Sequence, residues 1–166
     1  MARVAVSIGS NLERERNVKD ALRALGKTFG KLSRSPVYES AAYGFDGPPF
    51  YNLVVVFKTP LDVRAVREKI QAIENQQGRE MGENRSGSRS LDLDLLLYDD
   101  AVFHDQGLDV PRREIFEHAY ILKPLVDLLP AMLHPVTGES FAEIWHRLGS
   151  NQEALSVVDV DGLDLN

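Results

Sequence analysis

The segment Leu91-Asp92-Leu93-Asp94-Leu95-Leu96-Leu97-Tyr98 alternates apolar and acidic residues in its first half, and this period of two indicates a β-strand. The odd-numbered positions of such a strand share one face, which comprises Leu91, Leu93, Leu95 and Leu97. Asp92 and Asp94 project together from the other face, with Cβ atoms roughly 7 Å apart. The segment therefore predicts a strand that buries leucines on one side and presents two carboxylates on the other.

Five further elements are expected ahead of this strand, and together they determine the topology. They are a strand at 3–8, a helix at 17–25, strands at 30–38 and 53–57, and a long helix that ends at Gly78. Thr59-Pro60-Leu61-Asp62 is expected to start the long helix, with threonine as the cap and proline at the first helical position. The resulting order β-α-β-β-α-β is the ferredoxin-like arrangement, an α/β (α+β) sandwich.

The rest of the chain is expected to add C-terminal helices near 113–118, 122–129 and 141–148. With 166 residues, the chain has the size of one compact domain. We expect a single domain at 1–158, followed by a flexible polar tail at 159–166.

The composition argues against several classes of protein. A net charge of −6 and a pI near 5.2 disfavour a surface for nucleic acid or anionic lipid. No apolar run approaches the roughly 18 residues that a membrane span needs. The chain has no cysteine, and its first residues lack the pattern of a signal peptide. We therefore expect a cytoplasmic monomer with no nucleic-acid or membrane partner.

Asp92 and Asp94 are candidate metal ligands. Magnesium prefers oxygen ligands and is commonly held by one or two carboxylates together with substrate phosphates. The alternative is an amphipathic strand whose aspartates are simply solvated. Aspartate is disfavoured in strands, however, and the same face continues with the apolar Leu96, so the balance favours a site.

Three arginines lie just upstream of the acidic pair, at Arg79, Arg85 and Arg89. A guanidinium is always charged and binds phosphate oxygens in a bidentate manner. Arginines beside a metal-binding acidic pair are typical of a polyphosphate site, whereas the alternative is that they only neutralise the two aspartates. No P-loop sequence occurs, so the phosphates must be presented by other means.

Several motifs occur in an order that points to one known family. The most specific is Arg89-Ser90-Leu91-Asp92-Leu93-Asp94, which Ser86-Gly87-Ser88 precedes. The others are Gly9-Ser10-Asn11-Leu12, Phe50-Tyr51-Asn52, Ile73-Glu74-Asn75-Gln76-Gln77-Gly78-Arg79 and Tyr120-Ile121-Leu122-Lys123-Pro124-Leu125. With these motifs the chain resembles, over most of its length, the 6-hydroxymethyl-7,8-dihydropterin pyrophosphokinase family of folate biosynthesis.

The resemblance implies a ferredoxin-like domain that moves the terminal pyrophosphoryl group of ATP onto the hydroxymethyl oxygen of a reduced pterin and releases AMP. It implies that Asp92 and Asp94 hold two Mg²⁺ ions and that Arg79 and Arg89 contact the phosphates. Catalysis would then depend mainly on positioning and on charge neutralisation.

Substrate contacts also follow from the resemblance. The pterin residues that it implies are Ser40, Ala42, Tyr43, Phe50, Asn52 and Tyr120. The nucleotide residues are Gln71, Glu74, Arg85, Leu108, Arg112 and Arg113. Core packing is the alternative role for Phe50 and Tyr120, whereas a buried amide such as Asn52 needs partners.

Some positions depart from the family pattern. Ser86 stands where some members carry tryptophan, and Met81, Gly107 and His118 stand where arginine is often found. Arg112 occupies a position where histidine is common, and with Arg113 it is expected to supply compensating positive charge. These departures leave open a paralogue for a related pterin or a binding domain without catalysis. An RNA-binding module is the alternative from another class, and the acidic charge disfavours it.

Overall fold

The computed structural model describes residues 1–42, 46–80, 91–149 and 154–163. The first elements are β1 (Ala2–Ser10), α1 (Arg14–Phe29), β2 (Ser33–Arg34), β3 (Val37–Ser40), β4 (Phe50–Thr59), α2 (Val63–Glu80) and β5 (Asp92–Tyr98). The chain continues with β6 (Phe103–Asp105), β7 (Leu108–Val110), the 3-10 turn η1 (Arg113–Phe116), α3 (Ala119–Leu128), α4 (Phe141–Leu148) and β8 (Ser156–Val158). The predicted order β-α-β-β-α-β is confirmed, with the second strand divided into β2 and β3.

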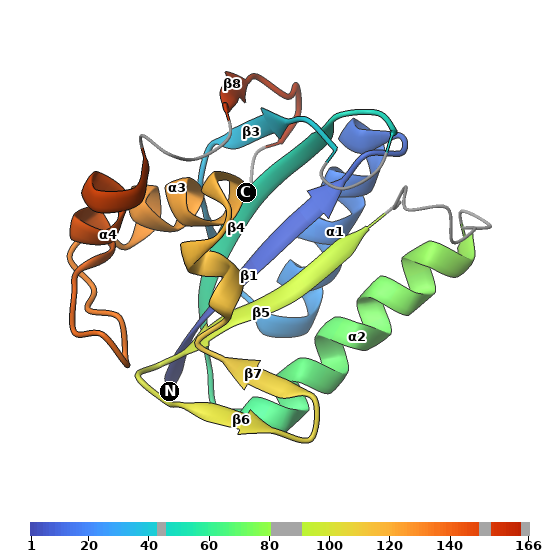
Figure 1. Cartoon of the computed structure of the whole chain (residues 1–166). Helices are drawn as coiled ribbons and strands as arrows, with labels where there is room; N and C mark the ends of the chain where they lie inside the picture. The colour runs from blue at the N-terminus through green and yellow to red at the C-terminus, as the bar shows by residue number, and fades with distance from the viewer. Residues whose placement is uncertain (43–45, 81–90, 150–153, 164–166) are drawn as a thin grey trace.

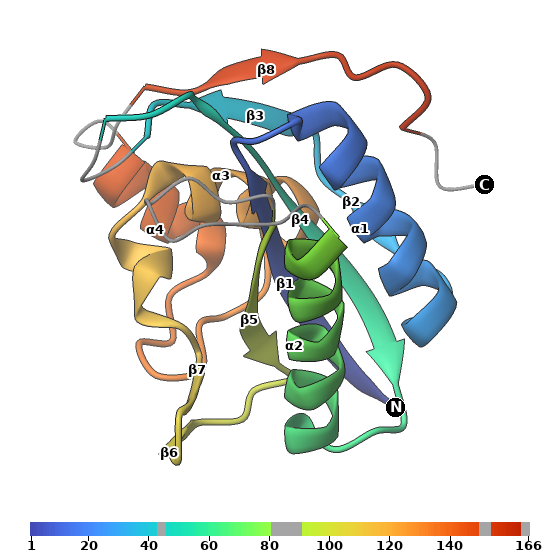
Figure 2. The same cartoon turned by 90° about the vertical axis from the view of Figure 1, so that its right-hand side faces the viewer.

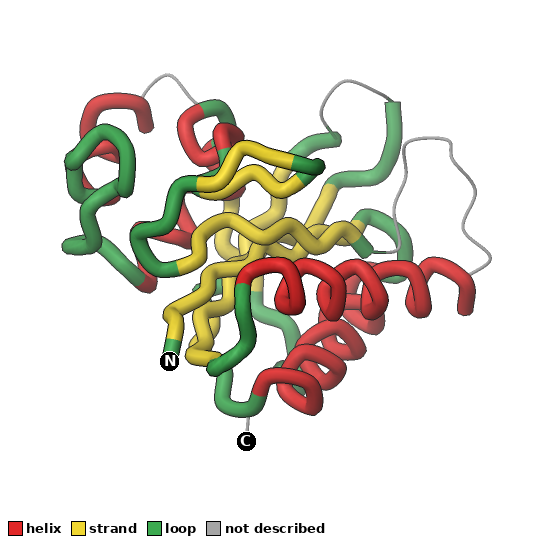
Figure 3. Tube along the Cα trace, turned by 90° about the horizontal axis from the view of Figure 1, so that it is seen from below, coloured by secondary structure: helices red, strands yellow, loops and turns green. Residues whose placement is uncertain are grey.

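The main sheet has the strand order β5-β1-β4-β3-β8, and β2 also pairs with β4. All of its pairs are antiparallel. α1 and α2 cover one face of the sheet, and α3 and α4 cover the other (Figure 1, Figure 2). Figure 3 shows the same layers from below, with the yellow strands between two groups of red helices. The predicted ferredoxin-like sandwich is therefore confirmed, with a second helical layer formed by the C-terminal helices.

The alternation of side chains along the central strands divides the core in two. Val4 and Val6 of β1 pack in the cluster that includes α1 and α2. Ala5, between them, packs with α3 and α4. Each core therefore uses one face of the same strand, as the pleat of a β-strand requires.

β5 follows this alternation only as far as Leu95. Of the leucines in segment 91–97, Leu91, Leu93 and Leu95 lie in the α1/α2 core. The prediction that Leu97 continues this face is wrong, because Leu97 packs with Leu96 in the α3/α4 core. The pairing with β1 shifts between Ala5 and Val6, so β5 holds one extra residue there, which is a β-bulge.

α2 begins later than the sequence predicted. Thr59 is the last residue of β4, and the helix starts at Val63 rather than at Pro60. The residue that caps it is Asp62, whose Oδ1 accepts a hydrogen bond from the Ala65 N–H at 2.8 Å. The aspartate satisfies a free N–H of the first turn, which Thr59 is too far away to do. The helix also continues past Gly78, to Glu80.

Two features at the sheet's periphery were not predicted. β6 and β7 form a hairpin, and their three-residue strands are too short to show a period. β8 extends the sheet beside β3, with Val37 opposite Val158 and Glu39 opposite Ser156.

The chain packs on the domain beyond the point where a free tail was expected to begin. Leu163 is buried, and its carbonyl oxygen accepts a hydrogen bond from Arg34 Nε at 3.0 Å. Leu163 holds the chain on the domain through its buried side chain and its carbonyl oxygen. The mainly polar composition of 159–166 does not indicate either contact.

Candidate active site

Gly9 lies at the centre of the candidate site. The strand register pairs it with Asn52 of β4 on one side and with Asp92 of β5 on the other. A Cβ atom on Gly9 would lie 3.4 Å from Asn52 Oδ1, 3.8 Å from Asp92 Cβ and 3.8 Å from Phe50 Cδ1. The absence of a side chain therefore leaves the space between an amide and a carboxylate open.

This space is the floor of a cavity of about 330 Å³, a volume that suits a small-molecule ligand. Its walls come from β1, the ends of β3 and β4, β5, and the segment from η1 into α3. The lining residues are Ser7, Ile8, Gly9, Ser40, Ala41, Phe50, Asn52, Asp92, Asp94, Glu114, His118, Tyr120 and Ile121. Six of the predicted site residues thus meet in one place.

One end of the cavity is neutral and hydrogen-bonded. Asn52 Nδ2 donates to Ser40 Oγ at 2.7 Å, and both residues are buried. With Nδ2 bonded to Ser40, Asn52 Oδ1 points toward the space above Gly9. Phe50 lines the same end, and the ring of Tyr120 stacks with that of His118 at 4.7 Å between centroids and 18° between planes. Aromatic walls and an oriented amide suit a flat, polar heterocycle.

A polar contact ties the two walls of this end together. The Tyr38 hydroxyl of β3 donates to Asp127 of α3, and Lys123 Nζ donates to Asp127 Oδ1 at 2.7 Å. Burial raises the pKa of Tyr38 well above its usual value, and the Asp127 carboxylate raises it further. The phenol therefore remains a donor, and it holds β3, which carries Ser40, against α3, which carries Tyr120.

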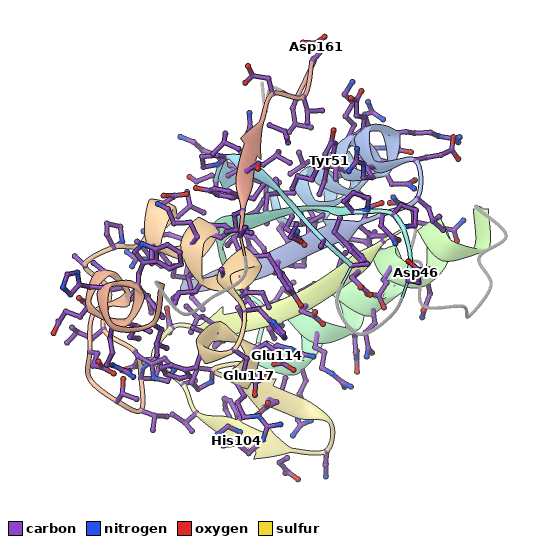
Figure 4. The ribbon with its side chains drawn as sticks, turned by 45° about the horizontal axis from the view of Figure 1, so that its top comes forward. Asp46, Tyr51, His104, Glu114, Glu117 and Asp161 are labelled. Atoms are coloured by element: carbon purple, nitrogen blue, oxygen red, sulfur yellow. The ribbon has the colours of Figure 1, made fainter. Side chains whose placement is uncertain are left out.

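The other end of the cavity is charged. Asp92 and Asp94 project from β5, and Glu114 projects from the segment between the β6–β7 hairpin and α3, where Figure 4 labels it beside Glu117. Arg112 Nη2 lies 3.3 Å from Asp94 Oδ1, and Arg112 Nε lies 3.3 Å from Glu114 Oε2. Burial raises the pKa of Asp94, Arg112 opposes this shift, and Glu114 adds to it. The carboxylate end is thus acidic and partly desolvated, which favours a cationic partner.

The strand that carries both aspartates is fixed at its outer edge. β5 is an edge strand, and the Leu93 N–H donates to Glu74 Oε2 of α2 at 2.7 Å. Leu93 lies between Asp92 and Asp94 in the sequence, so this bond holds the backbone from which the two carboxylates project.

Comparison with known proteins agrees with this geometry. A profile of the family described as 7,8-dihydro-6-hydroxymethylpterin-pyrophosphokinase (HPPK) matches residues 5–130. The chain belongs to this family. The 2-amino-4-hydroxy-6-hydroxymethyldihydropteridine pyrophosphokinase of Aquifex aeolicus is 33% identical over 138 residues, which are 82% of this chain and 86% of the relative.

Other relatives of this HPPK-family chain are much longer. The folic acid synthesis protein fol1 of Pneumocystis carinii is 34% identical over 148 residues, which are 87% of this chain but 20% of that protein. The mitochondrial folate synthesis bifunctional protein of Pisum sativum is 32% identical, and 30% of it is covered. The chain therefore spans a fifth to a third of the length of these two relatives.

Solved structures support the fold. A crystal structure of Plasmodium falciparum HPPK-DHPS superposes with a TM-score of 0.73 over 90% of this chain and 43% of that chain. Because the sequence identity is only 16%, this likeness concerns the fold alone. None of the described helices is both long and apolar enough to cross a bilayer.

The chemistry of the carboxylates in this cavity is compatible with Mg²⁺ that shares its coordination with a substrate. Among the described residues, no three side chains of His, Cys, Asp or Glu converge as a metal-binding group. Asp92 and Asp94, however, line one cavity from one strand. Two carboxylates are enough for Mg²⁺, because it keeps waters and takes substrate phosphates as its remaining ligands. The pair does not fit a closed structural metal site.

The remaining predicted residues lie elsewhere. Ala42 is described but is not among the lining residues, where its neighbour Ala41 takes part. Leu108 is 2% exposed and packs in the α1/α2 core, so its side chain does not reach the cavity. Gln71 is exposed on α2, and Arg113 is 82% exposed and pairs with Glu117 at 3.3 Å. None of these four predicted residues lines the cavity.

Several predicted residues cannot be placed. Tyr43, Arg85 and Arg89 lie outside the described residues. Arg79 lies in the last turn of α2, but its side chain is outside the described part of the chain.

Glu114 is an acidic lining residue that the sequence did not predict. It follows Arg112 by two positions in a segment without a clear period, and no motif marks it. Two other lining residues were noticeable in the sequence. His118 departs from the family pattern, and Gly9 is the first residue of the motif Gly9-Ser10-Asn11-Leu12. Their places in the cavity became clear only from the sheet register and from the start of α3.

Proposed function

We propose that this chain transfers the pyrophosphoryl group of ATP to 6-hydroxymethyl-7,8-dihydropterin, with AMP as the second product. The observation that carries the proposal is the row Asn52–Gly9–Asp92, which places an amide and a carboxylate on opposite sides of one open cavity floor. Membership of the HPPK family supports the same assignment, as does the name of the Aquifex aeolicus relative.

The neutral end is proposed to bind the pterin. Asn52 Oδ1 would accept a hydrogen bond from a ring N–H, because it faces the space above Gly9 while Asn52 Nδ2 donates to Ser40 Oγ. Phe50 and Tyr120 would flank the ring. Ala42 and Tyr43, which the family resemblance implies as pterin residues, remain part of this proposal. The hydroxymethyl group would then point across Gly9 toward Asp92.

The charged end is proposed to hold two Mg²⁺ ions through Asp92 and Asp94, together with the phosphates of ATP. Bound magnesium would neutralise phosphate oxygens and help align the attack. Arg79, Arg89 and Arg112 are proposed to contact the phosphates, and the other nucleotide contacts that the family resemblance implies remain part of this proposal.

The reaction forms one P–O bond, breaks another P–O bond and releases the hydroxyl proton. The hydroxymethyl oxygen bonds to the β-phosphorus, and the bond from that phosphorus to the oxygen shared with the α-phosphorus breaks. That oxygen leaves with AMP, and the hydroxyl proton passes to solvent. Asn52 and Gly9 contribute by orienting the acceptor, and the charged residues contribute by neutralising the transferred group.

The test is AMP formation from ATP and Mg²⁺, with and without 6-hydroxymethyl-7,8-dihydropterin, for the parent and for Asp94→Ala. We expect AMP only when the pterin is present, and none from the variant. If ATP and the pterin both bind but no AMP forms, the chain is a binding domain without catalysis. If AMP forms only with a related pterin, the acceptor in the proposal is wrong.

We propose in addition that the domain acts as a monomer in the cytoplasm. Sedimentation of the purified protein tests the first part, and fractionation of the source cells tests the second. A stable dimer, or the protein in an organelle fraction, would contradict the respective part.

A further inference from the structure

The guanidinium of Arg112 lies between two carboxylates of the candidate site. Its Nη2 is 3.3 Å from Asp94 Oδ1, and its Nε is 3.3 Å from Glu114 Oε2. The Arg112 backbone N–H donates to the Leu96 carbonyl oxygen of β5 at 2.9 Å. The arginine is therefore anchored beside the strand that carries Asp94, while its charged end is shared between two acids.

The contact between Arg112 and Glu114 is an ion pair without a hydrogen bond. Arg112 Nε and Glu114 Oε2 are buried atoms that make no hydrogen bond within the described structure. The side chains of Arg112, Asp94 and Glu114 are 31%, 40% and 36% exposed. Partly exposed ion pairs with imperfect geometry are weak. The guanidinium can thus leave Asp94 without a large loss.

We propose that Arg112 is a resident cation at Asp94 that couples metal binding to nucleotide binding, and that Glu114 positions it. In the free protein, Arg112 and a divalent cation compete for the same carboxylate, because two cations on one carboxylate repel each other. When nucleotide phosphates bind, Arg112 moves from Asp94 to the phosphates, and Asp94 becomes available to the cation. This inference rests on the proposed function, which makes Asp94 a metal ligand and ATP a substrate.

The coupling must act in both directions. If the nucleotide raises the affinity for the cation by some factor, the cation raises the affinity for the nucleotide by the same factor. Glu114 would keep the released guanidinium at the cavity, where it faces the phosphates. The arrangement prevents tight metal binding in the absence of substrate.

Manganese, which is visible by electron paramagnetic resonance, serves as the probe for the cation. Its affinity is measured for the nucleotide-free parent protein, Arg112→Gln, Arg112→Lys and Arg23→Gln. Arg23 is a matched control, because it lies on α1, is 71% exposed and pairs with Asp20. Thermal melting of each variant verifies that it is folded.

We expect Arg112→Gln to bind Mn²⁺ about 3- to 10-fold more tightly than the parent, which is the range for loss of one competing ion pair and its charge. Arg112→Lys keeps the charge and should stay near the parent, and Arg23→Gln should not change the affinity. An unchanged or weaker affinity in Arg112→Gln overturns the proposal.

A second measurement tests the coupling itself. Calorimetry gives the affinity for α,β-methylene-ATP with saturating Mn²⁺ and in EDTA, and the ratio of the two is the coupling factor. Metal–nucleotide complexes contribute to this ratio equally in all variants. The ratio should therefore fall by about 3- to 10-fold in Arg112→Gln, in line with the loss of competition. An unchanged ratio contradicts the coupling.

A double-mutant cycle distinguishes two roles of Glu114, the positioning of Arg112 and a direct attraction of the metal cation. Glu114→Gln should weaken Mn²⁺ binding in the parent, because Arg112 then rests fully on Asp94. In the Arg112→Gln background the same change should have much less effect. An equal effect in both backgrounds shows that Glu114 acts directly on the cation, which rules out its positioning role.

Failure of this inference is distinct from failure of the proposed function. If AMP formation depends on the pterin but Arg112→Gln leaves the Mn²⁺ affinity unchanged, the inference about Arg112 is wrong and the proposed reaction still holds. If the parent protein binds no Mn²⁺, with or without nucleotide, both the proposed metal site and the inference about Arg112 are wrong.

Discussion

Asn52 and Asp92 face the same gap above Gly9, yet their ends of the cavity are built differently. At the amide end, Ser40 and Asn52 are 4% and 5% exposed and bonded to each other. At the carboxylate end, the Asp94 side chain is 40% exposed, and the Arg112 guanidinium contacts Asp94 and Glu114 through ion pairs. A buried, satisfied polar pair keeps one geometry, whereas half-exposed charges can exchange partners. We infer that the neutral end is shaped before the ligand arrives and that the charged end is completed by it.

Asp92→Asn should break the charged end alone, with the largest effect. The amide keeps the shape but removes the charge that a cation needs, so turnover should fall about 10³-fold or more, as for loss of a main electrostatic group. Pterin binding, measured by fluorescence titration, should stay within about twofold, because the neutral end is intact. Asp100→Asn, an exposed aspartate after the same strand, is the matched control. Equal loss of pterin affinity in Asp92→Asn would show that the two ends are not separate.

Asn52→Ala should break the neutral end alone. The change removes the proposed pterin contact and leaves Ser40 Oγ without its donor, a loss of about 1–3 kcal/mol. The dissociation constant for the pterin should therefore rise about 10- to 100-fold, while the affinity for α,β-methylene-ATP is retained. Asn75→Ala, at an exposed asparagine of α2, controls for the substitution. A parallel loss of nucleotide affinity would contradict the division of the cavity.

Glu74→Ala should weaken the support of the charged end and so have a smaller effect. Leu93 N–H would lose its acceptor at the edge of the sheet, which costs about 1–3 kcal/mol of unfolding free energy. Turnover should fall by about 10-fold, because the backbone between the two aspartates is less well fixed, and Glu74→Gln should restore part of both losses. Glu68→Ala, at an exposed position of the same helix, is the control in denaturant melts and in the AMP assay. If Glu74→Ala lowers turnover without lowering stability, Glu74 acts on the nucleotide and not on Leu93.

The sequence was sufficient to predict the order of the main elements. The family resemblance named Ser40, Phe50, Asn52 and Tyr120 as pterin residues, and the fold places all four around one cavity. Period-two runs and helix stripes report which side is buried, and this is a local property. It failed at Leu97, because the bulge that rotates β5 depends on how β5 pairs with β1. The predicted start of α2 at Pro60 was also wrong, because Asp62, two residues later, caps the helix.

The charged end could be predicted only in part for a related reason. The spacing of Asp92 and Asp94 in the sequence indicates that they project together. Glu114, by contrast, reaches the cavity only through the turn that follows the β6–β7 hairpin. The pairing of Arg112 with Asp94 joins residues 18 positions apart, and neither residue shows it alone. The acidic character of this end could therefore be predicted from the sequence, whereas its ion pairs depend on the tertiary structure.

The smallest expected effect concerns His134, which lies behind the charged end because its ring contacts Phe116 of η1. Its Nδ1 accepts hydrogen bonds from the N–H groups of Val136 and Thr137, so the buried ring is neutral. Burial lowers the pKa of His134 below its usual value near 6.5, and the Glu139 carboxylate opposes this shift.

The sign of the pH effect follows from this lowered pKa. Between the lowered value and about 6.5 the unfolded chain binds more protons at His134 than the folded chain, so stability falls as the pH falls through this window. His134→Gln loses about 1–2 kcal/mol at pH 7.5 through the lost contacts, but it should not have this acid-dependent loss. The difference in unfolding free energy between parent and variant should thus narrow on going from pH 7.5 to pH 5. Urea melts of both proteins measure it, with His146→Gln, an exposed histidine of α4, as the control. A difference that stays constant or widens in acid would mean that His134 does not become harder to protonate on folding, and that the turn behind Glu114 is supported in another way.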